Sequence, residues 1–105
     1  MNNVNTNIGL LQIIKRAMGI KRKKEIVIKT VKMIAFGTTQ TYKQIAFKSR
    51  INITPKMVGK ILATNDKLIA IPCHRVIYSN GDIGGYRLGK DFKKFLLEWE
   101  KRVIS

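Results

Sequence analysis

The sequence is poor in acidic residues, and this shortage dominates its charge. Only 6 Asp and Glu stand against 21 Lys and Arg, which leaves a formal net charge of +15 at pH 7 on 105 residues. A surface of such positive potential attracts polyanions. Nucleic acid is therefore the expected partner.

Cysteine and histidine are equally scarce, with one of each. A single cysteine cannot form an internal disulfide, and one cysteine with one histidine cannot build a zinc cluster. Apolar runs, such as residues 68–71, are far shorter than the roughly 18 residues of a membrane span, and no secretory leader is recognisable. We therefore expect an intracellular protein, cytoplasmic or associated with the nucleoid, without a bound metal and without a membrane partner.

The first 24 residues differ from the remainder of the chain. A short amphipathic stretch with Ile8, Leu11 and Ile14 leads into a basic block at residues 21–24. Clustered like charges repel one another unless they are solvated or face phosphates. We predict a basic arm or short helix at residues 1–24, followed by one domain at residues 25–105. A solvated flexible arm is the alternative to one that contacts DNA.

Apolar spacing predicts a helix over residues 25–36 that ends at Gly37. Two short helices follow. Thr41 and Gln44 fit a capping box, and Thr54 with Pro55 fits a capped start of a second helix that reaches about residue 64. Two short helices joined by a polar turn are typical of a helix-turn-helix motif, although they also occur in proteins that never bind DNA. The net charge favours DNA binding.

The remaining sequence favours a small β element and a final helix. Residues 67–72 are extended in character, residues 76–78 are strand-like, and Asn80-Gly81 is typical of a tight turn. Gly84-Gly85 indicates a close approach of the backbone. The final helix carries an apolar stripe that we expect to be ordinary core packing: Phe92, Phe95, Leu96, Trp99 and Val103.

The chemistry concentrates at Pro72-Cys73-His74-Arg75. A lone cysteine is most often a small buried hydrophobe. Here a base and a fixed positive charge follow it directly, and such surroundings favour the nucleophilic thiolate. Neighbours in the chain need not have neighbouring side chains, so an inert cysteine remains the alternative.

These residues resemble a known family. The segment 72–76, Pro-Cys-His-Arg-Val, is similar to the active-site signature of the O6-alkylguanine-DNA alkyltransferases. The resemblance extends over residues 25–101 through further elements in the family's order: Gly37 with Tyr42-Lys43-Gln44-Ile45-Ala46, Val58-Gly59, Asn65 eight positions before the cysteine, Gly84-Gly85-Tyr86-Arg87, and Leu96-Leu97 with Glu100. It implies a mainly α fold with a small β element, a winged-helix-like helix-turn-helix alkyltransferase domain.

The resemblance also implies an activity. An alkyl group would pass from O6-alkylguanine in double-stranded DNA to Cys73, once per molecule, on a monomer that needs no cofactor or metal. His74 would act as base through a water, Glu100 would orient the imidazole, and Asn65 would brace the turn that carries the cysteine. Whether O4-alkylthymine is also a substrate is left open.

A guanine must leave the base stack before a sulfur can reach its O6 substituent. The resemblance assigns this step to Tyr42, assisted by Lys93, and to a recognition helix in which Gly59 allows close approach to the minor groove. Lys56 stands where the family has an arginine, and lysine lacks the planar group that stacks on bases. The implied contacts to the guanine come from a further set: the backbone of Cys73, Val76 and Arg87, with Arg75 and Tyr86.

Two departures from the family pattern leave open how closely the recognition helix approaches the groove and how bulky an alkyl group fits. Lys60 replaces a second small residue of the recognition helix, and Leu88 stands where the substrate loop often has Trp or Gly. The alternatives to a transferase are an alkyltransferase-like protein that binds damaged guanine without transfer, and a small helix-turn-helix regulator with an inert Cys73.

Three implied site residues also have ordinary structural interpretations. Tyr42 would fit a packing residue, Glu100 a solvated partner of a lysine, and Asn65 a helix C-cap. These interpretations differ in burial and in hydrogen-bond partners, so the structure can separate them.

Overall fold

The structure, a computed structural model, describes residues 3–105 and is built mainly from helices. In chain order the elements are α1 (Asn3–Lys32), β1 (Gln40–Thr41), α2 (Tyr42–Lys48), α3 (Pro55–Ala63), a 3-10 turn (Cys73–Arg75), β2 (Val76–Ile77) and α4 (Lys90–Ile104). The prediction of a mainly α fold with a small β element is confirmed. Among the described residues, no helix has both the length and the apolar content that crossing a membrane requires.

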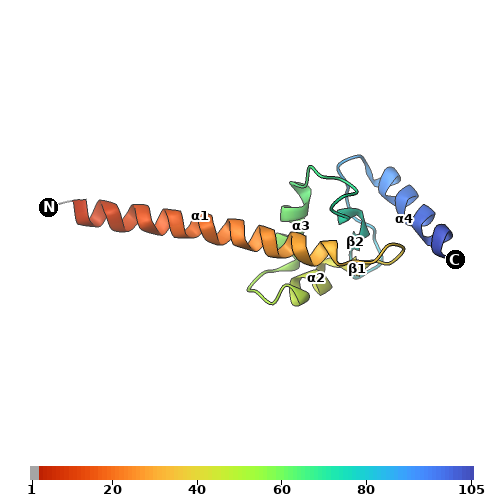
Figure 1. Ribbon diagram of the computed structural model, residues 1–105, viewed down its shortest axis with the longest axis horizontal. Helices are drawn as coiled ribbons and strands as arrows, with labels where there is room; N and C mark the ends of the chain where they lie inside the picture. The colour runs from red at the N-terminus through yellow and green to blue at the C-terminus, as the bar shows by residue number, and fades with distance from the viewer. Residues whose placement is uncertain (1–2) are drawn as a thin grey trace.

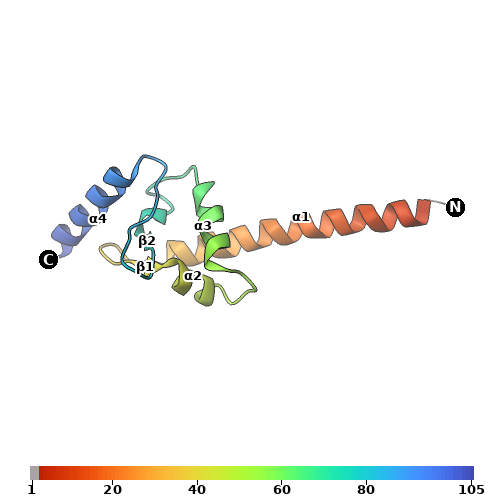
Figure 2. The same ribbon diagram turned by 180° about the vertical axis from the view of Figure 1, so that it is seen from behind.

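Helix α1 is a long rod, and only its C-terminal part meets the rest of the molecule (Figures 1 and 2). The molecule measures 68 × 25 × 22 Å because α1 projects from one end of the body while α4 lies at the other. The helix is continuous, so the arm and the helix predicted over residues 25–36 form one element. It ends at Lys32, before the predicted Gly37, whose φ of 80° places it in the following loop.

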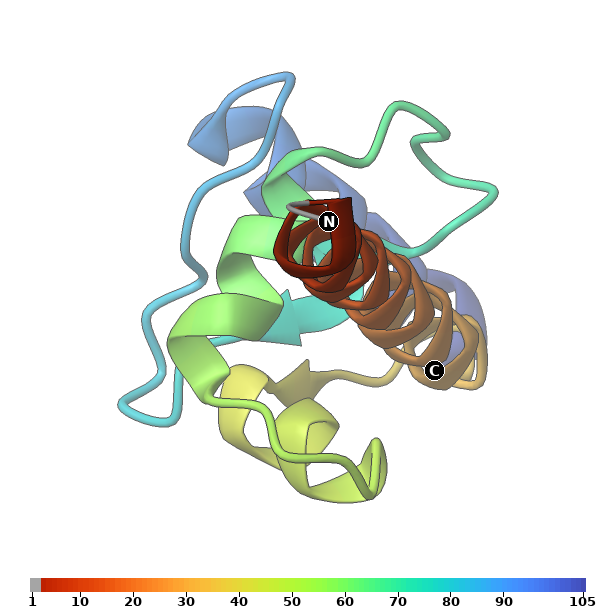
Figure 3. The same cartoon turned by 90° about the vertical axis from the view of Figure 1, so that its left-hand side faces the viewer.

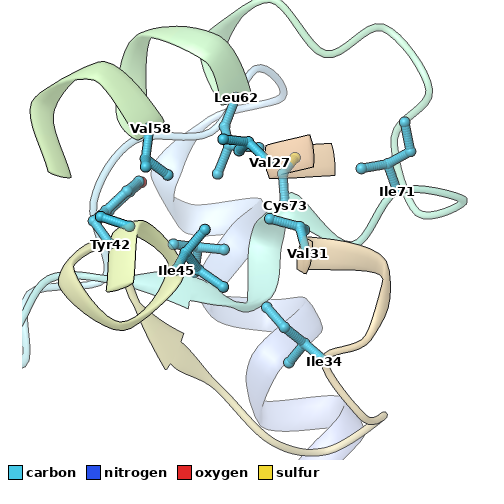
Figure 4. Close-up of a cluster of buried hydrophobic side chains, with 11 residues drawn as sticks. Val27, Val31, Ile34, Tyr42, Ile45, Val58, Leu62, Ile71 and Cys73 are labelled. Atoms are coloured by element: carbon cyan, nitrogen blue, oxygen red, sulfur yellow. The ribbon is translucent and has the colours of Figure 1, made fainter. Parts of the chain in front are cut away.

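The core forms where the last turns of α1 meet α2, α3 and the segment around the cysteine. Figure 3 looks along α1 from its N-terminal end, and the other elements gather around the far end of this helix. The buried apolar cluster, most of which is labelled in Figure 4, comprises Val27, Val31, Ile34, Tyr42, Ile45, Ala46, Val58, Leu62, Ile71, Cys73 and Val76. The cysteine is thus part of the core, and its accessibility depends on whether its sulfur also borders a cavity.

The two short helices form as predicted. At the start of α2, the Thr41 hydroxyl accepts a hydrogen bond from the Gln44 N–H at 3.0 Å, and Gln44 Oε1 accepts one from the Thr41 N–H at 2.8 Å. At the start of α3, Thr54 Oγ1 accepts from the Met57 N–H at 3.1 Å. Helix α3 stops where expected, with Thr64 as its C-cap. These caps satisfy backbone donors that a helix start leaves free.

The β element is a pair of two-residue parallel strands. Gln40 pairs with Val76, and Thr41 pairs with Ile77. The strand after the cysteine was predicted, whereas its partner before α2 was not, because two residues carry no detectable periodicity. Residues 67–72 do not form the expected extended segment: they make one isolated bridge, and Ile69 there has a φ of 73°.

Helix α4 buries a different face from the one predicted. Phe92, Phe95, Trp99 and Val103 of the apolar stripe are 41–58% exposed, and only Leu96 is buried. The buried face consists of Lys93, Leu96 and Glu100. The prediction of ordinary core packing is therefore wrong, because the two charged side chains find buried partners and apolar periodicity does not register such partners.

Candidate active site

A cavity with a volume of about 660 Å³ opens beside the cysteine. Six of its lining residues belong to the predicted site: Tyr42, Lys56, Gly59, Cys73, Tyr86 and Arg87. Helices α2 and α3 supply one wall, and the loop after β2 supplies another through residues 85–87. A cavity of this size can receive a flat, base-sized group.

Cys73 reaches this cavity although its side chain is only 7% exposed. Asn65 holds the turn that carries it: its Nδ2 donates to the Ile71 carbonyl at 3.3 Å and to Cys73 Sγ at 3.2 Å, and its Oδ1 accepts from the Lys67 N–H at 2.9 Å. Because the C-cap of α3 is Thr64, the interpretation of Asn65 as a helix cap is wrong. The asparagine ties the end of α3 to the sulfur.

His74, the residue after the cysteine, forms a buried pair with Glu100. His74 Nε2 lies 2.6 Å from Glu100 Oε2, and the two side chains are 1% and 4% exposed. Within the described part of the chain, His74 Nδ1 is buried without a hydrogen-bond partner. The interpretation of Glu100 as a solvated partner of a lysine is therefore wrong.

Arg75 completes the Glu100 environment instead of facing the cavity. Its Nε donates to Glu100 Oε1 at 2.9 Å, its Nη2 donates to Oε2 at 3.1 Å, and its Nη1 donates to the Ile34 carbonyl at 3.0 Å. The guanidinium carbon also lies 5.3 Å from the centre of the Phe36 ring. Such a two-pronged contact fixes the carboxylate more firmly than a single bond does. The guanidinium thus binds Glu100 and the Ile34 carbonyl, and it is not placed to bind a substrate.

Two opposing influences act on the pKa of Glu100. Burial raises the pKa, whereas hydrogen bonds from Arg75, from His74 and from the Gly37 N–H at 3.3 Å lower it; together these bonds win and hold the pKa below its usual value. The carboxylate is therefore ionised at neutral pH, which suits it to orient a histidine and to stabilise its charged form.

Lys93 is fully buried beneath the cavity. Its Nζ donates to the Val76 carbonyl at 2.7 Å and to the Gly85 carbonyl at 3.3 Å, and it lies 5.9 Å from the centre of the Tyr42 ring. Burial lowers the pKa of this amine to about 8, against the opposing effects of Cys73 and Asp82. The Val76 carbonyl, which was predicted to contact the guanine, thus accepts a hydrogen bond from Lys93 in this structure.

Tyr42 stands at the cavity wall, with Tyr78 beside it at a ring-centre distance of 4.8 Å. Burial, followed by Tyr78 and Cys73, raises the pKa of Tyr42 to about 12, so its hydroxyl keeps its proton and can donate a hydrogen bond. The predicted close approach is confirmed at Gly84, where a Cβ would lie 3.2 Å from Tyr42 Oη and 3.0 Å from Tyr78 Cε2. At Gly85, nothing lies within 4 Å of such a Cβ.

The lowered pKa of Lys93 and the raised pKa of Tyr42 predict that the protein is most stable at alkaline pH. From pH 8 to 10 the unfolded chain binds more protons at Lys93 than the folded protein does, because its pKa of 10.5 falls to about 8 on folding. The free energy of unfolding should therefore rise with pH over this range. Above pH 10, unfolded Tyr42 ionises before folded Tyr42, whose pKa is about 12, so stability should fall.

Urea unfolding at a series of pH values measures this prediction. Lys93→Met should abolish the rise between pH 8 and 10, while Lys94→Met, at the exposed neighbouring position, should keep it. A rise that survives in the Lys93 variant would assign it to another group.

Of the predicted site residues, the structure brings nearly all to one region. The nucleophile candidate lines the cavity, Asn65, His74 and Glu100 lie behind it, and Lys93 and Val76 lie beneath it. Tyr78 lines the cavity but was not singled out from the sequence, where it resembled any strand residue. No sequence signal distinguished it.

The fold and cavity define a helix-turn-helix domain with a cysteine at its pocket. The family described as "6-O-methylguanine DNA methyltransferase, DNA binding domain" matches residues 22–102. The chain belongs to this family. The match spans the helix-turn-helix, the cysteine turn and nearly all of α4.

Curated relatives carry the name methylated-DNA–protein-cysteine methyltransferase. The protein of Methanocaldococcus jannaschii is 48% identical over 75 residues, which cover 71% of this chain and 43% of the relative. That of Saccharolobus islandicus is 49% identical over 74 residues, 70% of this chain and 47% of the relative. The chain thus spans somewhat less than half the length of these relatives.

Solved structures of proteins of the same fold superpose on this chain. The Mycobacterium tuberculosis OGT in complex with DNA superposes with a TM-score of 0.72 at 35% identity, over 75% of this chain and 48% of that one. The Schizosaccharomyces pombe Atl1, in complex with damaged DNA containing O6-carboxymethylguanine, gives 0.68 at 28% identity, over 76% of both chains. The shared fold is therefore found in proteins bound to DNA.

Proposed function

We propose that this protein repairs double-stranded DNA by transferring the alkyl group of O6-alkylguanine to Cys73, as a methylated-DNA–[protein]-cysteine S-methyltransferase. The observation that carries the proposal is the position of the sulfur: it borders a base-sized cavity, and the next residue in the chain, His74, is paired with the buried Glu100. The names of the relatives support the same activity.

His74 acts as the base. Glu100 holds Nε2 and leaves Nδ1 as the nitrogen that can take a proton, directly or through a water. Arg75 keeps both oxygens of Glu100 in place, so its role is to position the carboxylate. Asn65 braces the cysteine turn through its bonds to Ile71 and to the sulfur.

The transfer is one in-line displacement. A bond forms between Cys73 Sγ and the alkyl carbon while the bond from that carbon to guanine O6 breaks, and its electron pair stays on the guanine. The thiol proton passes to His74, and the leaving guanine takes up a proton in exchange. Hydrogen bonds to the guanine lower the barrier, and the protonated Tyr42 hydroxyl at the cavity wall can donate one. The thioether has no hydrolytic exit, so each molecule reacts once.

DNA binds across α3 and the loop after β2. Lys56, Lys60 and Arg87 line the cavity and offer cations to the flanking phosphates. Lys56 takes the place that the guanine vacates, and Gly59 allows the groove to come close. The transfer site is complete within one chain, in residues 25–105, and residues 1–24 take no part in it.

Intact-mass measurement tests the proposal. After incubation with a duplex that contains O6-methylguanine, the protein should gain one methyl group, and peptide mapping should place it on Cys73. Binding of the duplex without a mass gain would instead indicate an alkyltransferase-like protein that recognises damage only.

Gly59→Ala separates folding from DNA approach. A Cβ at this position would lie 3.8 Å from the Tyr42 ring, an ordinary contact, and alanine favours the middle of a helix by about 1 kcal/mol over glycine. The melting temperature should therefore rise, while the rate of transfer from duplex DNA should fall about tenfold because the methyl group obstructs the groove. Equal transfer rates for both proteins would contradict the proposed docking.

A further inference from the structure

We propose that the projecting part of α1 is a dimerisation arm, which pairs antiparallel with the same arm of a second copy. The transfer site does not use this segment, so the inference goes beyond the proposed function and does not depend on it. It rests on the distribution of apolar and charged side chains along α1.

One apolar seam runs from the core out along the arm. Its positions alternate spacings of three and four residues, which keep them on one side of a helix, and all but Lys24 are apolar: Leu10, Ile13, Ala17, Ile20, Lys24, Val27 and Val31. At the body, Val27 and Val31 are fully buried in the core. Along the arm the same seam is uncovered, with Leu10, Ile13 and Ile20 between 55% and 65% exposed. Apart from the exposed Lys24, the side of α1 that packs into the core therefore stays apolar along the arm.

A second apolar ridge widens this side of the arm. Leu11, Ile14 and Met18 flank the seam and are 45–65% exposed. At about 100° per residue, the opposite side carries Gln12, Lys15, Arg16 and Gly19. Residues 10–20 thus form an amphipathic helix with an apolar half that nothing in the described chain covers. An uncovered apolar surface of this kind marks an interaction site.

The charges select the orientation of the pair. In a parallel pair, Lys21 and Lys24 of the apolar side would face their own copies. In an antiparallel pair centred on residue 15, position 24 lies opposite position 6 and position 27 lies opposite position 3, so the partner helix ends where the body begins. Leu10 then meets Ile20 of the second copy, and Ile13 meets Ala17. Lys15 and Arg16 remain on the outer side.

A lipid surface fits this helix less well. Lys21, Lys24 and Glu25 interrupt the apolar side next to the arm, and the first 35 residues contain no aromatic side chain to anchor in a headgroup layer. Pairing with a second copy requires neither a longer apolar side nor an aromatic anchor, since the arm of that copy supplies the complementary apolar ridge. This proposal replaces the sequence-based expectation of a monomer, since the arm would join two catalytic units.

Sedimentation velocity of the full chain without DNA tests the association. Over micromolar concentrations we expect twice the monomer mass. Ile13→Glu places a charge in the seam and should weaken dimerisation by at least ~100-fold. Gln12→Glu adds the same charge on the opposite side and should leave it unchanged. Both variants should keep the helical content of the wild type, since neither residue touches the core. A wild type that stays monomeric overturns the proposal, and so does a monomer that binds anionic phosphatidylserine vesicles through this helix.

Disulfide trapping tests the orientation. In a Cys73→Ser background, the double variant L10C/I20C should form a covalent dimer on mild oxidation, because the two positions meet across the pair. L10C alone should not. Efficient trapping by L10C alone would mean a parallel pair and would overturn the antiparallel arrangement.

Discussion

Replacing Cys73 with alanine is expected to abolish methyl transfer while leaving DNA binding intact. The sulfur is the nucleophile of the proposed reaction, and no other thiol exists in the chain. The side chain contributes one small buried group to the core, so its loss should cost only about 1 kcal/mol of stability. Affinity for a duplex containing O6-methylguanine should change by less than about threefold, or 0.6 kcal/mol.

The measurements are intact mass after incubation and fluorescence anisotropy for binding. Cys73→Ser is the matched variant, because a hydroxyl keeps the shape and a hydrogen-bond acceptor for Asn65. A methyl gain in either variant would move the acceptor to another residue. Loss of binding together with folding would give the cysteine a structural role.

Glu100→Gln is expected to slow transfer roughly 100-fold, the contribution of a positioned general base. The amide keeps the shape but no longer orients His74 as a base or stabilises its charged form. It also leaves the Arg75 guanidinium without its counter-charge, at a cost of roughly 3 kcal/mol in stability. Single-turnover transfer, measured below the melting temperature of the variant, reports the rate.

The same variant should change the response to acid. Because the pKa of Glu100 is lower in the folded protein than in the unfolded chain, its stabilising contribution is present above the unfolded value and is lost as the pH falls through the folded value. Glu100→Gln should remove this part of the acid loss. Glu98→Gln, at an exposed position of the same helix, is the control and should retain both the acid profile and the transfer rate. Similar behaviour of the two variants would refute the role of Glu100.

The side chain of Arg75 contacts other partners than the sequence suggested. Its position next to His74 indicated a charge near the sulfur or the substrate. In the structure, its side chain spans to Glu100 of α4 and to the Ile34 carbonyl after α1. The substitution that tests this is Arg75→Lys: it keeps the charge but loses the two-pronged contact, so transfer should slow about tenfold while DNA affinity stays constant. A loss of DNA affinity without a change in the transfer rate would indicate that Arg75 contacts the substrate instead.

Sequence by itself determined the local structure at the helix starts and at the tight turn, and it indicated the family of this protein. The caps at Thr41 and Thr54 and the turn at Asn80-Gly81 involve residues at most three apart, so a single sequence contains them in full. Excess lysine and arginine indicated a polyanionic partner, and the cysteine segment with its companion motifs indicated the family, which the comparisons confirm.

Only the tertiary structure decided which side chains meet. His74 and Glu100 are 26 positions apart, and Lys93 reaches a carbonyl 17 positions away. Those contacts reverse the buried face of α4, because a charged group with buried partners can replace an apolar one. The arm shows the converse. Its apolar residues follow the same periodicity as Val27 and Val31, yet they are exposed, because periodicity states which side of a helix seeks a partner and only packing in three dimensions supplies one.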